Sequence, residues 1–280
     1  MHHHDCTGCG VCLLVCPVWR ERRDLRLTPK GRARALQHGA TRAELAASIA
    51  GCTLCGACEP ACPEELPLVD MVMALRREAD LPAGADDFSA RKDKSYLLAG
   101  QALRANAALL KSSLQCFPGH DLAADDGDDI AAALESGAVL DAARLEAFLA
   151  SLAQARRLVV GNALLLRFLR RWLPGITAMG LGEALLPATR SKIAPRDLYV
   201  IDARAYNLDQ ARLVGHYDAL RAMSGCHMNL DLQRIAVPAA GQGDWILEGR
   251  DVERIVVEDA ADRDAFAASG RPVVHVLELV

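Results

Sequence analysis

Hydrophobic residues in the first eighty positions recur at helical spacing. One such run predicts a helix that continues to about Asp80, and its apolar positions are Leu68, Met71, Val72 and Leu75. A helix is also expected over residues 41–50, because Thr41 and Glu44 have the spacing of a capping box. The N-terminal part of the chain is therefore expected to be mainly helical.

The pattern changes near residue 97, where short apolar runs begin to alternate with amphipathic helices, as is typical of α/β folds. Residues 81–96 precede this change and are predicted to be a linker, since Pro82 and Gly84 interrupt regular structure. We expect a helix directly after the linker, with apolar positions at Leu97, Leu98, Leu103 and Leu110.

The second half contains a weak internal repeat. The apolar runs 157–160 and 254–257 each lead to a helix and then to a second apolar segment with one glutamate, Glu183 or Glu278. The simplest interpretation is a pair of related units that share one order of elements.

Each copy of the repeat has a further apolar run upstream, at 113–117 and at 198–201. Both runs are predicted to be strands. Helices are expected after them, over 130–135 and 209–223. The second half should therefore form two α/β units, each with a small parallel sheet.

Composition narrows the class of partner. The chain of 280 residues has a net charge of -4, whereas nucleic-acid binding favours a basic face.

No apolar stretch reaches the roughly 18 residues of a transmembrane helix, and the longest, 158–173, is interrupted by Arg167, Arg170 and Arg171. The N-terminus also shows no signal-peptide pattern. We therefore expect a cytoplasmic protein that meets a membrane only through a partner.

Eight of the ten cysteines form two runs of the pattern Cys-x2-Cys-x2-Cys-x3-Cys-Pro. The runs are Cys6, Cys9, Cys12 and Cys16 before Pro17, and Cys52, Cys55, Cys58 and Cys62 before Pro63. Three thiolates with this spacing on a tight turn can reach three iron atoms of one cubane cluster, so the fourth ligand comes from elsewhere. Nearby glycines are expected to keep the backbone close to the cluster, and these are Gly8, Gly10, Gly51 and Gly56.

Bacterial ferredoxins use this spacing to bind a pair of 4Fe-4S clusters, and in them the fourth cysteine of each run ligates the other run's cluster. The resemblance implies that cluster 1 is held by Cys6, Cys9, Cys12 and Cys62. It implies that cluster 2 is held by Cys52, Cys55, Cys58 and Cys16. Zinc is a weaker alternative, because zinc sites use paired cysteines rather than four in a row before proline. Disulfides are a second alternative, but they belong to oxidising compartments.

The two runs, the segment Thr28-Pro29-Lys30-Gly31-Arg32 between them and the repeated second half together resemble one protein family. This family comprises the iron-sulfur subunits of glycolate oxidase, lactate utilisation, anaerobic glycerol-3-phosphate dehydrogenase and heterodisulfide reductase. The resemblance implies an α+β multi-domain fold: an α-helical dicluster ferredoxin domain followed by a duplicated α/β domain with small parallel sheets, known as the CCG domain. The expected boundaries are 1–80 for the ferredoxin, 81–96 for the linker and 97–280 for the CCG-like domain.

The second half departs from that family at the cysteines that give the CCG domain its name. Ala239-Ala240-Gly241 stands where Cys-Cys-Gly is expected, and Ile201-Asp202-Ala203-Arg204 stands where His-Asp-Pro-Cys is usual. Only Cys116 and Cys226 remain in this half, and buried free thiols are the favoured interpretation. The alternative is a metal site made by both cysteines with His120 and His227.

The resemblance implies an electron-transfer subunit with two 4Fe-4S clusters and no catalytic residues of its own. Its expected partners are a flavin-dependent dehydrogenase or a related iron-sulfur subunit on one side and a quinone-linked acceptor on the other. The alternative is a catalytic subunit similar to heterodisulfide reductase, with a redox metal in the α/β half. The chain shows no nucleotide-binding glycine motif that would indicate a flavin or nucleotide of its own.

Overall fold

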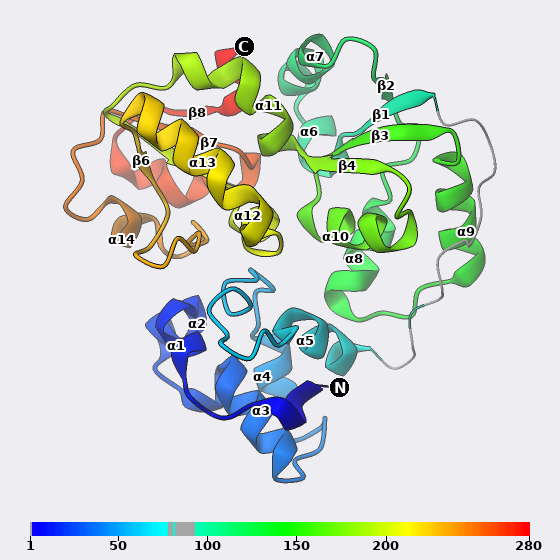
Figure 1. Cartoon of the computed structure of the whole chain (residues 1–280), viewed down its shortest axis with the longest axis vertical. Coiled ribbons are helices and arrows are strands. Elements are labelled where there is room, and N and C mark those ends of the chain that lie inside the picture. Colours follow the sequence, from blue (N-terminus) through cyan, green and yellow to red (C-terminus); the bar gives the residue numbers. More distant parts are fainter. Residues whose placement is uncertain (1, 78–80, 82–92) are drawn as a thin grey trace.

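The computed structural model describes residues 2–77, 81 and 93–280. Its N-terminal module, residues 2–77, consists of short helices joined by loops and lies apart from the two sheets (Figure 1). The helices are η1 (His2–Asp5), α1 (Val11–Val15), α2 (Pro17–Arg22), η2 (Leu25–Leu27), α3 (Pro29–Gln37), α4 (Ala46–Ala50) and α5 (Leu68–Arg76).

Local sequence signals explain where these helices begin. Thr28 caps α3 by accepting a hydrogen bond from the backbone N–H of Gly31. The predicted capping box also forms, because the Thr41 backbone N–H donates to Glu44 at 2.8 Å, although regular helix begins only at α4 after a stretch of turns. The apolar run before Asp80 forms α5, which ends at Arg76, and positions 78–80 lie outside the described residues.

The second half contains two four-stranded sheets flanked by helices (Figure 1). The elements of the first unit are β1 (Lys94–Leu98), α6 (Gly100–Arg104), α7 (Ala107–Cys116), β2 (Asp121–Leu122), α8 (Asp128–Ser136), α9 (Ala142–Ser151), β3 (Ala155–Val160), α10 (Ala163–Trp172), β4 (Thr177–Gly180), α11 (Leu181–Thr189) and η3 (Arg190–Lys192). The elements of the second unit are β5 (Asp197–Val200), α12 (Ala203–Asn207), α13 (Gln210–Ser224), β6 (His227–Met228), α14 (Gly243–Leu247), β7 (Arg254–Val257), η4 (Ala260–Ser269), β8 (Val273–His275) and η5 (Val276–Leu279).

Both sheets are parallel throughout and have corresponding strand orders, β2-β1-β3-β4 and β6-β5-β7-β8. The prediction of small parallel sheets is therefore confirmed. The two glutamates of the repeat occupy matching places, since Glu183 and Glu278 are each the third residue of the helix that follows the last strand of a sheet.

Two predictions in the first unit are wrong. Leu97 and Leu98 belong to strand β1 rather than to a helix, and this strand begins inside the segment predicted as a linker. The run 113–117, predicted as a strand, instead lies at the end of α7, where Leu109 and Ser113 bury one helical face. A short apolar run is too short to show whether its period is that of a strand or of a helix. Strand β1 forms because it pairs with β3, which is distant in the sequence.

The core is continuous between the N-terminal module and the first unit. Side chains of α5, such as Met71 and Val72, share one apolar cluster with Leu134 of α8 and Phe148 of α9. A second cluster lies between the two sheets and contains Val159 of β3 and Val256 of β7. The module is thus packed against the α/β half over a buried apolar surface, which fixes the position of the cysteine loops.

Candidate iron-sulfur site

The eight cysteines of the two runs line two separate pockets of the N-terminal module. One pocket is lined by Cys6, Cys9, Cys12 and Cys62. The other is lined by Cys16, Cys52, Cys55 and Cys58. All ten cysteines of the chain are free thiols. Each pocket therefore collects three thiols from one run and the last thiol from the other, while the assignment of ligands to clusters stays a prediction.

The two pockets are adjacent, because Pro29 of α3 and Leu68 of α5 line both of them. Cys16 reaches the second pocket because it forms the N-cap of α2, where Pro17 starts a helix that leads the chain away. The pockets differ in exposure at their edges. Cys9 of the first pocket is exposed, whereas Cys16 of the second is buried.

The glycines of the runs serve different purposes. Gly10 has a φ of 87°, and a Cβ there would lie 3.3 Å from the Lys30 ammonium nitrogen at the first pocket. Gly56 has a φ of 75°, but its Cβ would lie 2.9 Å from Leu208 of the second unit, so this glycine permits packing between domains. Gly51 has an ordinary right-handed helical conformation, so its backbone conformation does not require glycine, and its role near a cluster stays a prediction.

Burial favours the protonated forms of several of these thiols. It raises the pKa of Cys12 to about 11 and the pKa of Cys55 to about 11, although backbone N–H groups of Lys30 and Ala57 oppose these shifts. Burial also raises the pKa of Cys16, against hydrogen bonds from the amides of Trp19 and Val18. Amides directed at sulfur suit a thiolate bound to iron, and cluster assembly here must release protons.

The second pocket also contains an unusual buried cation. Arg32 of α3 is 1% exposed and lines this pocket, and its Nε–H has no hydrogen-bond partner. A buried donor without an acceptor is costly. A 4Fe-4S cluster with four thiolate ligands carries negative charge and accepts hydrogen bonds at sulfur. The residues of the second pocket therefore fit such a cluster.

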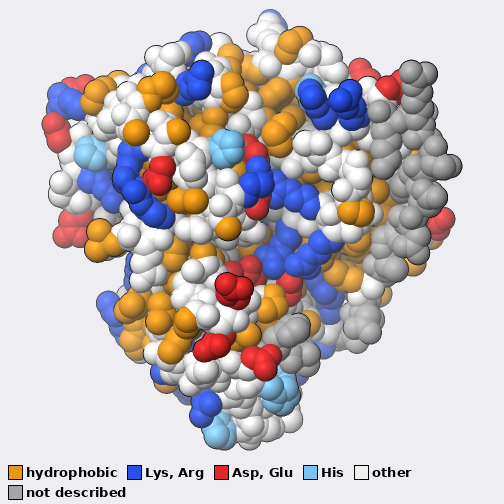
Figure 2. Space-filling view, viewed as in Figure 1, with side chains coloured by type: hydrophobic (Ala, Val, Ile, Leu, Met, Phe, Trp, Pro, Cys, Tyr) orange, Lys and Arg blue, Asp and Glu red, His pale blue; other side chains and the backbone are white. Residues whose placement is uncertain are grey.

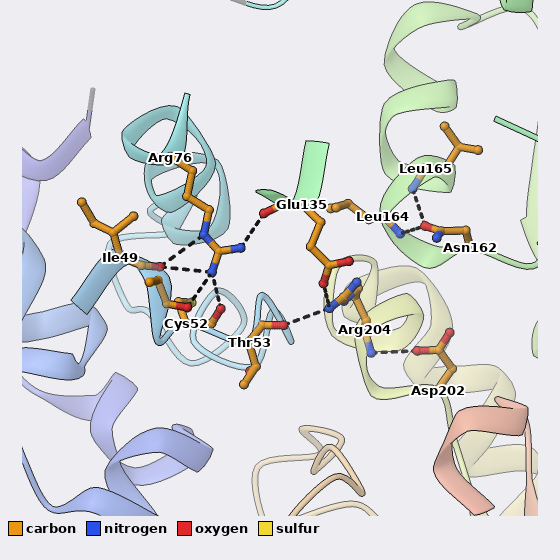
Figure 3. Close-up of polar contacts among 11 residues, drawn as sticks. Ile49, Cys52, Thr53, Arg76, Glu135, Asn162, Leu164, Leu165, Asp202 and Arg204 are labelled. Atoms are coloured by element: carbon orange, nitrogen blue, oxygen red, sulfur yellow. Dashed lines mark hydrogen bonds and ion pairs between the residues drawn. The ribbon is translucent and has the colours of Figure 1, made fainter. Parts of the chain in front are cut away.

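Two arginines connect the loop of the second pocket to the α/β half (Figure 3). Arg76 donates to the carbonyl oxygens of Ile49 and Cys52 and, at 2.5 Å, to that of Glu135 in α8. Arg204 of α12 donates to the Thr53 carbonyl at 3.0 Å and to the Glu135 carboxylate at 2.8 Å. The backbone that carries Cys52 is therefore held from both units of the fold.

A group of ion pairs joins α10 of the first unit to the module, close to the end of the second cysteine run. Arg167 donates to Glu59 at 2.8 Å and to Asp70 at 3.0 Å, and Arg171 donates to Asp70 at 2.6 Å. Figure 2 shows basic and acidic side chains gathered on this face where the module meets the α/β half. Because Glu59 directly follows Cys58, these pairs also position the second run.

A cleft of about 490 Å³ opens between the second pocket and the α/β half. Thr53 and Cys55 form one side of it. The opposite side is formed by residues that follow the carboxyl ends of β1, β3, β5 and β7, namely Gly100, Gly161, Asp202 and Asp259. Crevices at the carboxyl ends of parallel strands are where α/β folds bind ligands.

A buried carboxylate lies next to this cleft, at the end of β7. Glu258 is 4% exposed and accepts hydrogen bonds at 2.8 Å from the hydroxyls of Tyr199 and Tyr217. Its second oxygen accepts the backbone N–H of Asp202 at 2.9 Å. Burial nevertheless outweighs these donors and raises the pKa of Glu258 to about 7.

Glu258 should make the stability of the fold fall with rising pH. In the unfolded chain it ionises near its ordinary pKa of about 4.3, whereas in the folded chain it keeps its proton up to about 7. The free energy of unfolding should therefore decline between about pH 5 and 7, by up to roughly 3 kcal/mol from this group. In Glu258→Gln the decline should be smaller, which chemical unfolding at several pH values measures. Parallel curves for the two proteins would contradict the assignment.

The remaining cysteines and histidines of the second half are not gathered into a metal site. Cys116 ends α7 and lies near Lys192, while Cys226 is buried beside Ser224. The His120 ring is tilted against the Phe117 ring with 5.6 Å between their centroids, and His227 lies in β6. Over the described ranges, no group of three or more His, Cys, Asp or Glu side chains is arranged to hold a single metal ion.

These features define the N-terminal part as a ferredoxin-like iron-sulfur unit with an electron-transfer role. More particularly, residues 2–66 match the family described as the 4Fe-4S dicluster domain. No curated protein and no solved structure matches the chain. Among the helices that the structure describes, none combines the length and the apolar character needed to cross a bilayer.

Sequence reasoning missed the residues that surround the clusters. Arg32 and Lys30 belong to the segment used for the family resemblance, but the sequence did not indicate that each lines a cysteine pocket. Arg76, Arg167 and Arg204 carry no local signal, because their partners are distant along the chain.

Proposed function

We propose that this chain is the electron-transfer iron-sulfur subunit of an oxidoreductase complex. It would relay single electrons between a partner dehydrogenase or reductase and an acceptor, with one 4Fe-4S cluster in each pocket. The observation that carries the proposal is the division of eight thiols into two adjacent pockets of four. Each cluster, when bound, supplies a one-electron redox centre, and the protein holds the two centres close together and partly away from water.

The α/β half would act as the docking scaffold for these centres. We propose that its two units descend from one duplicated CCG-like unit, because both sheets are parallel with corresponding strand orders and matching glutamates. The cysteines that would give such a unit its own redox centre are absent at Ala239-Ala240-Gly241. The scaffold would then position cluster 2 through Arg204 and through Glu135, whose backbone carbonyl accepts a hydrogen bond from Arg76 of the module.

The proposed partners follow from the family resemblance. A flavin-dependent dehydrogenase or a related iron-sulfur subunit would exchange electrons at one end, and a quinone-linked protein would do so at the other. Cys9 supports this arrangement, because an exposed ligand brings cluster 1 within reach of a docked protein.

A second candidate function is a reductase whose substrate occupies the cleft of about 490 Å³. The cleft favours it, because Cys55 lines both this space and the second pocket. A small electron acceptor bound there would lie beside cluster 2. Steady-state reduction of such an acceptor by the isolated chain, with a chemical reductant as the only electron source, would favour this candidate over the relay.

Iron analysis tests the relay. Anaerobically purified chain should contain about eight iron and about eight sulfide per molecule, as two cubane clusters require. It should also show the broad visible absorbance of 4Fe-4S centres, which dithionite bleaches. A colourless protein with zinc would overturn the proposal, and a clear surplus of iron over eight would place a further centre in the α/β half.

A further inference from the structure

The buried guanidinium of Arg32 points to an unequal pair of clusters. Resting on the proposed function, we infer that Arg32 raises the midpoint potential of cluster 2 above that of cluster 1. An electron that enters the module would then reside on cluster 2, beside the α/β half. Arg32 would thus act on the clusters through its charge, and electrons would pass preferentially from cluster 1 to cluster 2.

The first observation is that the protein itself does not neutralise Arg32. Its Nη1 donates to the carbonyl oxygens of Leu27 and Ser48, both at 2.9 Å. Among residues 2–77 and 93–280, no carboxylate pairs with it, and its buried Nε–H is unpartnered. A full positive charge in the interior is unfavourable unless an anion compensates it.

The second observation is where this charge acts. Arg32 lines the pocket of Cys16, Cys52, Cys55 and Cys58. Reduction adds one negative charge to a cluster, so a nearby cation stabilises the reduced form and raises the midpoint potential. Arg32 is therefore placed to favour an electron on cluster 2.

The first pocket has a weaker counterpart. Lys30 lines it from the same helix, but this lysine is only half-buried, and Cys9 at the same pocket is exposed. Water screens a charge near the surface more strongly than a buried one. Hydration near Cys9 also favours reduction of cluster 1, but we expect the unscreened charge of Arg32 to dominate. Arg76, which donates to the backbone carbonyl of Cys52, adds to the effect at cluster 2.

The test is an EPR-monitored redox titration of the full chain with both clusters in place. In the unaltered protein, the cluster whose signal is lost in Cys16→Ser should be reduced first. In Arg32→Gln, the ratio of reduced to oxidised cluster 2 at a fixed potential should fall about tenfold, which for one electron is about 59 mV. In Arg32→Lys, which retains a charge, the change should be less than threefold. In Lys30→Gln, the matched control, cluster 2 should be unchanged.

Three results would overturn the inference: reduction of cluster 1 first in the unaltered protein, equal shifts of both clusters in Arg32→Gln, or equal shifts of cluster 2 in the Gln and Lys variants. The order in the unaltered protein decides the matter even if Arg32→Gln fails to hold iron. An unaltered protein without clusters would refute the proposed function itself, whereas two clusters in the reverse order would refute only the role of Arg32.

Discussion

A Cys16→Ser variant is expected to lose cluster 2 and to keep cluster 1, although Cys16 belongs to the first run. The reason is that Cys16 lines the pocket of Cys52, Cys55 and Cys58 and lies buried at its wall. A serine hydroxyl is not ionised near neutral pH and cannot replace the thiolate. Iron content should fall from about eight to about four per chain.

EPR of the reduced variant supplies the measurement, because two reduced clusters close together broaden each other's signals. Cys16→Ser should show the simple spectrum of a single cluster. The matched control is Cys62→Ser, which should lose cluster 1 instead, since Cys62 lines the pocket of Cys6, Cys9 and Cys12. If each variant lost the cluster of its own run, the crossed assignment would be wrong.

The crossed arrangement depends on contacts that the spacing of cysteines does not contain. Pro29 and Leu68 belong to different helices, yet both lie between the two pockets. The chain between Cys16 and Cys52 includes α3 and α4, and Arg32 of α3 donates to the Ser48 carbonyl within α4. This contact brings the end of the first run and the start of the second together.

Strong local signals in the sequence predicted most of the elements correctly. The helical period before Asp80, the runs 157–160 and 254–257 and the helix over 209–223 all correspond to observed elements. The first has a sustained helical period, the two runs are repeated in the same order of elements, and the last helix ends at Gly225 in the left-handed conformation. The failures lie at β1 and α7. Leu97 and Leu98 face two different apolar clusters, so their burial follows from sheet pairing and not from any helical face.

The site could be predicted only as far as its ligands. Cysteine spacing predicts which thiols bind iron, since three of them must reach one cluster from one loop. The arginines around the second pocket follow no such spacing in the sequence. Arg76 and Arg204 meet at Glu135 from opposite sides of the fold, and only the packed structure shows that they hold the same loop.

Arg167→Met should weaken the junction between the module and the α/β half more than any exposed arginine would. Arg167 has only 11% of its side chain exposed, and its partners Glu59 and Asp70 are 16% and 27% exposed. Removing one partner of a buried pair leaves the other charge without compensation, at a cost of about 3–5 kcal/mol when burial is complete. We expect about 2–4 kcal/mol here, because Asp70 is partly exposed and still accepts from Arg171.

The loss of stability in Arg167→Met should affect cluster 2 first, because Glu59 directly follows Cys58 in the chain. The Glu59 carboxylate also accepts the Val69 backbone N–H at 2.9 Å. With Arg167 absent, the second run should loosen, and exposure to air should bleach half of the visible absorbance faster than in the unaltered protein. Arg196→Met is the control, since its partners Asp251 and Glu253 are 76% and 61% exposed. An exposed pair of this kind contributes about 0–1 kcal/mol. Equal thermal stability and equal bleaching rates in the two variants would show that the ion pairs of α10 do not support the second cluster.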